Sequence, residues 1–122
     1  MKLPVVIPSL AAAKYWAPTS LGTTDWVPVS QERIDRFAEA TDDRQWIHVD
    51  VERARRESLF GQTIAHGYLT LSLIPELLSR LLVIIGVKTA INTGIDKLRF
   101  SAPVLSGARV RLKAEIKDAR EM

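Results

Sequence analysis

The spacing of apolar residues predicts a short helix near the end of the first third of the chain. Ile34 and Phe37 lie three positions apart, with polar residues between them, so residues 31–40 are expected to form an amphipathic helix. Ser30 precedes this segment and is a favourable N-cap, since its hydroxyl oxygen accepts a hydrogen bond from a backbone N–H of the first turn.

A longer apolar segment runs from about Ile64 to Leu82, with leucines three and four positions apart. It is apolar on nearly all sides, which is typical of a helix covered by the rest of the domain. Pro75 lies inside the segment and is expected to kink the helix, because proline removes one backbone hydrogen bond.

The pattern changes to alternation in the last third of the chain. Between Ala108 and Lys117, apolar and charged residues alternate, which predicts a half-buried antiparallel strand. Further candidate strands are Thr23–Val29, Thr89–Thr93 and Asp96–Phe100. Strands on either side of two short helices and one long helix predict an α+β fold, with a sheet wrapped around the long helix.

Length and composition narrow the class of protein. With 122 residues, 47% of them hydrophobic, the chain fits a single globular domain over residues 1–122. It has no cysteine, which excludes disulfides, a thiolate nucleophile and iron–sulfur clusters. Only two histidines are present, so a multi-histidine metal cage is not expected, and no cofactor is predicted.

The charge distribution does not indicate a nucleic-acid or membrane protein. The formal net charge is only +3, and the densest basic run, Arg53 to Arg56, is flanked by glutamates. This run is interpreted as a solvated helix face, or alternatively as a surface that attracts an anionic small molecule. Glu76 and Arg80 inside the long apolar segment argue against a membrane helix, and prolines interrupt the apolar N-terminus, so a cytoplasmic location is expected.

Candidate chemistry is concentrated in residues 41–50, which show neither helical nor strand period and are expected to form a loop. Asp43 and His48 could act as an acid–base pair. Their separation would reach about 17 Å in an extended chain, so the loop must fold back to bring them together. The alternative is a capping aspartate and a surface histidine. Asp50 is expected to cap a short helix over residues 51–56.

A second candidate lies at the start of the long apolar segment. Gly67 would let a ligand approach the backbone at a helix N-terminus, where N–H groups are unpaired, and could bind a carbonyl oxygen. The alternative is a glycine needed for close packing. His66 alone is interpreted as a partly buried histidine with its hydrogen bonds satisfied.

Together these segments resemble a known family. The stretch ATDDRQWIHVD, followed by FGQTIAHGYLTLSLIP and later by INTGIDKLRFSAPVLSGARVR, is similar to the MaoC-like dehydratases, the (R)-specific enoyl-CoA hydratases. The family motif is G-D-x-N-P-x-H, followed by an H-G pair that opens the central helix. The resemblance runs from about Asp25 to Arg111 and implies a hotdog fold, usually as a homodimer.

The resemblance implies syn addition of water to a trans-2-enoyl thioester, giving an (R)-3-hydroxyacyl thioester, and the reverse. The motif's Asp and His fall on Asp43 and His48, which would hold the water and transfer its protons. The glycine of the H-G pair falls on Gly67, whose N–H would stabilise the thioester oxygen. Two alternatives stay open: a thioester-binding subunit without activity, and a hotdog thioesterase.

The sequence departs from the family pattern in several places. Asp42 replaces the motif's glycine, and remains an alternative for the carboxylate, while Gln45-Trp46 replaces Asn-Pro. Pro75 stands where the family often has a helix serine, so no serine role is assigned. Family members normally continue with two more strands, so the domain is expected to be short at its C-terminus, or to be covered there by further residues or by a partner.

The resemblance implies an acyl thioester of CoA or of a carrier protein as substrate. Plausible contacts to CoA phosphates are Arg53, Arg55, Lys97 and Arg99. The volume available to the acyl chain is expected to depend on Trp46, Tyr68 and Leu71.

Overall fold

The computed structural model describes residues 3–121, which form two compact units, each built from segments that are distant in the sequence. The first unit contains residues up to Asp25, Ile74–Leu98 and the segment from Arg111 onward. The second contains Trp26–Leu73 and Arg99–Val110. Helices and strands occur in both, which confirms the predicted α+β class.

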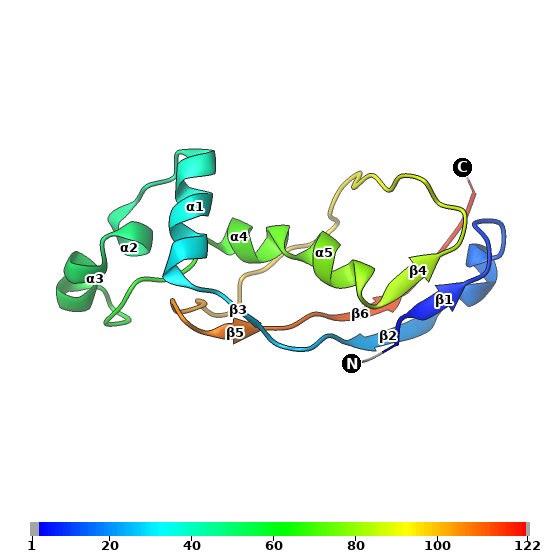
Figure 1. Cartoon of the computed structure of the whole chain (residues 1–122), viewed down its shortest axis with the longest axis horizontal. Coiled ribbons are helices and arrows are strands. Elements are labelled where there is room, and N and C mark those ends of the chain that lie inside the picture. The colour runs from blue at the N-terminus through cyan, green and yellow to red at the C-terminus, as the bar shows by residue number, and fades with distance from the viewer. Residues whose placement is uncertain (1–2, 122) are drawn as a thin grey trace. The chain divides into compact units, whose positions relative to one another are not determined.

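The first unit contains two strand pairs, a 3-10 helix and an α-helix (Figure 1). Strand β1 (Val5–Ile7) pairs in parallel with β4 (Leu82–Ile84). Strand β2 (Thr19–Thr23) pairs antiparallel with β6 (Lys113–Ile116). A 3-10 helix covers Ala13–Trp16, and α5 covers Ile74–Ser79. The buried apolar residues of this unit are Ile7, Leu21, Leu77 and Leu81.

The second unit contains most of the helices. Strand β3 (Val27–Pro28) pairs antiparallel with β5 (Arg109–Val110). Its helices are α1 (Gln31–Thr41), α2 (Trp46–Val49), α3 (Val51–Glu57) and α4 (Gly67–Ser72). The core of this unit consists of Val29, Ile34, Ala65 and Leu69, against which Phe37, Leu73, Val104 and Val110 pack.

Two short helices and their caps are confirmed. The Arg33 N–H donates to the Ser30 hydroxyl at 3.2 Å, and α1 begins directly after this cap. The Arg53 N–H donates to the Asp50 carboxylate at 3.1 Å, at the start of α3. The prediction of an uninterrupted loop over residues 41–50 is wrong, because residues 46–49 form the single turn α2.

The prediction of one kinked helix from Ile64 to Leu82 is also wrong. Helix α4 ends at Ser72 and α5 begins at Ile74, so Pro75 lies in the first turn of a new helix. A proline is tolerated there because the first N–H groups of a helix have no partner within it. The segment ends in strand β4, where Leu82 pairs with Val5.

Two predicted strands are wrong and one is interrupted. Thr89–Thr93 and Asp96–Phe100 form no strand, and residues 85–103 are exposed throughout. They therefore lack the neighbouring strand and buried face that would stabilise an extended segment. The strand predicted over Ala108–Lys117 is divided into β5 and β6. Between β5 and β6, the Leu112 N–H donates a hydrogen bond to the Thr24 hydroxyl. In a continuous ladder this N–H would donate to a backbone carbonyl, so the strand is interrupted here.

The strands that the structure describes form three two-stranded ladders. Between residues 3 and 121, the helices are all too short or too polar to cross a bilayer.

Candidate active site

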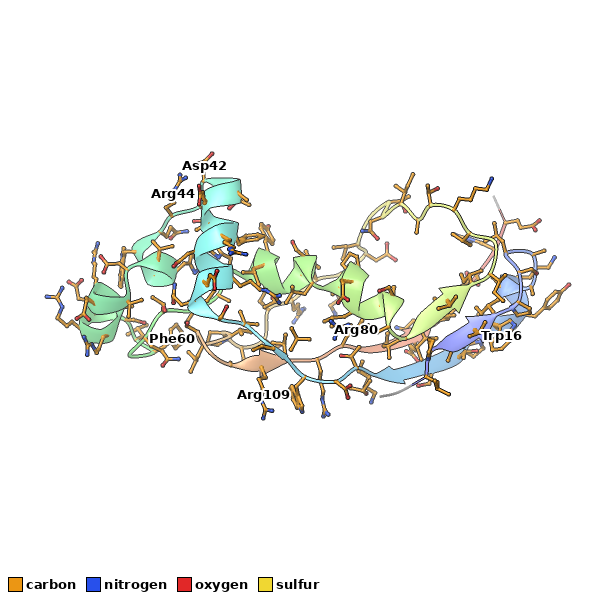
Figure 2. All side chains as sticks on the ribbon, in the orientation of Figure 1. Trp16, Asp42, Arg44, Phe60, Arg80 and Arg109 are labelled. Atoms are coloured by element: carbon orange, nitrogen blue, oxygen red, sulfur yellow. The ribbon has the colours of Figure 1, made fainter. Side chains whose placement is uncertain are left out.

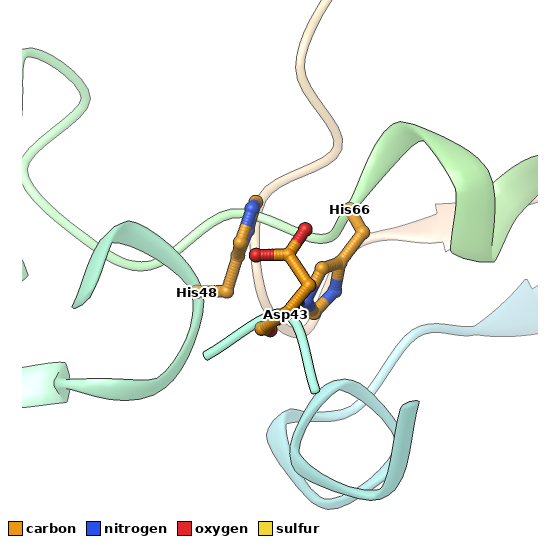
Figure 3. Close-up of side chains that lie close together, drawn as sticks. All are labelled: Asp43, His48 and His66. Atoms are coloured by element: carbon orange, nitrogen blue, oxygen red, sulfur yellow. Dashed lines mark hydrogen bonds between the residues drawn. The ribbon is translucent and has the colours of Figure 1, made fainter. Parts of the chain in front are cut away.

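The structure brings together three side chains that are far apart in the sequence (Figure 3). One carboxylate oxygen of Asp43 and one ring nitrogen each of His48 and His66 lie within 4.8 Å of one another. Asp43 follows α1, His48 lies in α2, and His66 is the N-cap of α4. All three belong to the second unit, and both histidines are buried. The fold-back that the Asp43–His48 pairing requires is therefore present.

Hydrogen bonds hold both the side chain and the backbone of His48. Its Nδ1 lies 2.7 Å from the Ile64 carbonyl oxygen. A carbonyl only accepts, so Nδ1 carries the hydrogen, and in the neutral ring Nε2 keeps its lone pair. The Gln31 side-chain amide donates to the His48 carbonyl at 2.8 Å, and the Ile64 N–H donates to the Ile47 carbonyl at 3.0 Å. His48 thus presents a basic nitrogen from a rigidly held turn.

The Asp43 carboxylate is presented by a tight turn at the end of α1. Asp42 adopts the left-handed conformation, with φ of 62°. This backbone favours glycine but tolerates aspartate, which explains how Asp42 can stand where the family motif has glycine. The Asp42 carboxylate is exposed and pairs with Arg44 at 2.6 Å (Figure 2). The Gln45 amide donates to the Asp43 carboxylate at 3.4 Å. The three-residue cluster contains Asp43 and not Asp42.

The third member, His66, was not assigned to the site from sequence. Its Nε2 lies 2.9 Å from the Asp43 carbonyl oxygen, and its ring stacks on the His48 ring with centroids 3.8 Å apart. The expectation of fully satisfied hydrogen bonds is wrong, because Nδ1 is buried and has no partner among the residues described.

A cavity of about 270 Å³ adjoins the two histidines. Gly67, the first residue of α4, lines it, so its N–H lies where the helix leaves backbone donors unpaired. A Cβ at Gly67 would come within 3.0 Å of three Phe100 ring atoms. Gly67 therefore serves close packing, and the binding of a carbonyl oxygen by its N–H stays a prediction. The full lining is His48, Ile64, Ala65, His66, Gly67, Thr70 and residues 100–104.

Residues expected to limit the acyl chain lie outside this cavity. Trp46, Tyr68 and Leu71 are absent from the lining, and Tyr68 is exposed and packs its ring edge-on against Phe100. The wall is instead formed by Thr70 and residues 100–104. A sequence pattern could not identify this wall, because residues 100–104 have no regular structure and meet the cavity only through tertiary contacts.

Two arginines considered for CoA binding are engaged with acidic neighbours. Arg53 bonds to Glu57 at 2.6 Å and lies over the Trp46 ring at 4.2 Å. Arg55 pairs with Glu52, and its hydrogen bond and charge lower the pKa of that carboxyl. These pairs agree with a solvated helix face on α3.

The three side chains leave room for a small bound species between them. Two groups bonded tetrahedrally to one water at about 2.8 Å lie about 4.6 Å apart. The three atoms lie within 4.8 Å of one another, so a water fits between them. Two donor atoms on one Zn²⁺ ion, with bonds of about 2.1 Å, lie at most about 4.2 Å apart, and the same limit of 4.8 Å also admits such a pair.

Comparisons with known proteins find relatives along most of the chain. The family model described as MaoC-like domain matches residues 17–122. The chain is 47% identical over 116 residues to a 3-hydroxyacyl-thioester dehydratase Z of Mycobacterium tuberculosis, covering 95% of this chain and 74% of that protein. It is 34% identical over 106 residues to a 3-hydroxybutyryl-CoA dehydratase of Methylorubrum extorquens, covering 85% and 64%.

A solved structure shares the fold of this chain. The "Monoamine oxidase regulatory protein" of Archaeoglobus fulgius matches with a TM-score of 0.72 and 24% identity, covering 99% of this chain and 78% of that one. This match confirms the predicted fold, and the two dehydratases confirm the predicted enzyme class, a hydro-lyase. The chain belongs to the MaoC-like dehydratase family and has its hotdog fold.

Proposed function

We propose that this chain catalyses the reversible syn hydration of trans-2-enoyl thioesters to (R)-3-hydroxyacyl thioesters. The observation that carries the proposal is the convergence of the Asp43 carboxylate and the His48 ring, next to a cavity that His48 and Gly67 line. A base and a carboxylate around one water-sized position are what the addition of water to an activated double bond requires.

In the hydration direction, one water binds between Asp43 and His48. The carboxylate accepts one hydrogen of the water and orients it, and His48 Nε2 accepts the other. As the water oxygen bonds to C3 of the enoyl group, a proton passes to His48 and the electrons of the double bond move toward the thioester carbonyl. His48 and Asp43 between them then deliver a proton to C2. Both additions occur from the same side, which gives syn stereochemistry.

Gly67 supplies the stabilisation of the transient enolate. Charge develops on the thioester oxygen only as C3 is attacked, so a fixed N–H donor lowers the barrier more than it strengthens substrate binding. Gly67 lines the cavity, and its N–H, at the start of α4, has no partner within the helix. The absence of a side chain at this position leaves room between the backbone and the Phe100 ring.

The substrate class we assign is an acyl thioester carried by CoA or by a carrier protein. The names of the two dehydratases support this assignment, since one acts on a hydroxyacyl thioester and the other on a CoA thioester. A cavity of about 270 Å³ holds roughly nine waters at about 30 Å³ each, which suits a short acyl group, with the rest of the carrier outside.

The test follows the loss of the enoyl absorbance of crotonyl-CoA in the wild-type chain and in the variants Asp43→Asn and His48→Ala. We expect turnover in wild type and losses of about 100-fold or more in both variants. Asp42→Asn is the matched control, since it removes the neighbouring exposed carboxylate and should keep activity.

Product analysis separates the alternatives. Hydration consumes the enoyl group without releasing a thiol, whereas a thioesterase would release free CoA, which a thiol reagent detects. A folded wild-type chain that binds crotonyl-CoA without consuming it would overturn the proposal and indicate a binding subunit.

A further inference from the structure

His66 contacts both residues that the proposed reaction uses. Its Nε2 bonds to the Asp43 carbonyl oxygen at 2.9 Å, and its ring lies face to face with the His48 ring, with an interplanar angle of 23°. The Phe37 ring packs on it at a centroid distance of 4.9 Å. His66 is only 3% exposed, so its ring is held on several sides.

The hydrogen bonds of His66 argue against a role in proton transfer. The Asp43 carbonyl only accepts, so Nε2 of His66 carries the hydrogen, and the lone pair of the neutral ring is on Nδ1. This Nδ1 is buried without a partner among the residues described. His66 and His48 both line the cavity, but the Nδ1 of His66 is buried and has no neighbour among the described residues with which to exchange a proton.

We propose that His66 is a positioning residue that holds Asp43 and His48 in the arrangement that binds the water. The inference rests on the proposed function and adds a third residue to it. The bond to the Asp43 carbonyl fixes the backbone from which the carboxylate projects, and the stacked ring fixes the plane of the His48 imidazole. A displacement of about 1 Å in either group is enough to cost about 100-fold in rate.

Three variants separate the two contacts. His66→Ala removes both, and is expected to lower kcat about 100-fold with a much smaller change in KM, because His66 is only one of several residues that line the cavity. His66→Gln keeps a donor near the position of Nε2 and loses the stacked ring. His66→Phe keeps an aromatic ring and loses the donor. Each is expected to recover about tenfold in kcat over His66→Ala, since one neutral hydrogen bond contributes up to about 1.5 kcal/mol.

A spectroscopic readout tests the inference independently of turnover. The chain has two histidines, so every His66 variant leaves the His48 imidazole as the one histidine signal. We expect ring nitrogen shifts in wild type that show His48 with its hydrogen on Nδ1. In His66→Ala, a mobile His48 ring should give averaged or exchange-broadened shifts, and His66→Phe should restore the sharp signal.

The outcomes are distinguishable. Full kcat in His66→Ala together with an unchanged His48 signal would overturn the positioning role, even if the melting temperature falls. A rise in KM with kcat unchanged would also overturn it, and would instead assign His66 to substrate binding. If wild type has no turnover, the proposed function fails, and the His48 signal still decides whether His66 orders that ring.

Discussion

Replacing Gly67 by alanine tests the cavity and the proposed oxyanion donor together. The new Cβ would lie 3.0 Å from three atoms of the Phe100 ring, against 3.4–4 Å for ordinary contact, so the ring must retreat by about 0.4 Å or more. Phe100 is 50% exposed, which leaves it room to move. Overpacking costs about 1–3 kcal/mol, and the helix preference of alanine over glycine offsets up to about 1 kcal/mol.

The expected net destabilisation is therefore about 0–3 kcal/mol, a fall in melting temperature of roughly 12 °C or less. Activity should fall much further. Alanine keeps the backbone N–H, but its methyl group is expected to keep the thioester oxygen from reaching this donor, and loss of contact with one oxyanion donor costs about 100-fold or more in kcat. The measurement is crotonyl-CoA hydration, with thermal unfolding of the same samples.

A double variant is the control for the ring. Gly67→Ala combined with Phe100→Leu relieves the contact but leaves the methyl group at the N–H, so stability should recover and activity should not. If Gly67→Ala folds and keeps kcat within about threefold, the N–H does not face the reacting oxygen and Gly67 serves packing alone.

Three further variants test separate parts of the argument. Asp42→Gly should change stability by less than about 1 kcal/mol, because glycine suits the left-handed backbone and the lost Arg44 pair is exposed. Its activity should be retained, and a loss as large as that of Asp43→Asn would assign the reacting carboxylate to Asp42. Ser30→Ala should lower stability by about 1 kcal/mol through loss of the α1 cap, with kcat unchanged, and an unaltered unfolding curve would contradict the cap. Arg99, exposed and next to Phe100 of the cavity wall, should contribute to CoA binding. Arg99→Ala should therefore raise KM for crotonyl-CoA but not for a crotonyl thioester without phosphates, and equal effects on both substrates would exclude a phosphate contact.

The helices show most clearly which features follow from the local sequence and which depend on tertiary packing. Helix α1 and helix α3 were predictable because their signals are local: each has a capping oxygen that bonds to an N–H three residues on. The break between α4 and α5 was not, because Pro75 is compatible with a kink inside one helix or with the first turn of a second. Which of the two occurs depends on packing that the helix pattern does not contain.

Strand formation depends even more than helix formation on contacts that the local sequence pattern does not contain. A strand is stabilised by a neighbour that is distant in the sequence, so alternation alone does not decide whether it forms. The alternating segment after Ala108 does pair in part, as β5 with β3 and as β6 with β2. Thr89–Thr93 has β-favouring residues but is exposed and forms no strand.

At the site, the sequence by itself determined the family and the candidate reacting groups. Asp43, His48 and Gly67 were identified because their residue types and order match a motif, and the composition excluded thiolate chemistry. The tertiary structure decided how these groups are held: the tautomer of His48 through the Ile64 carbonyl, and the stacking of His66 on the His48 ring. It also decided which residues wall the cavity. These contacts join residues 16 or more positions apart, and periodicity and spacing describe only near neighbours along the chain, so the pattern carries no information about them.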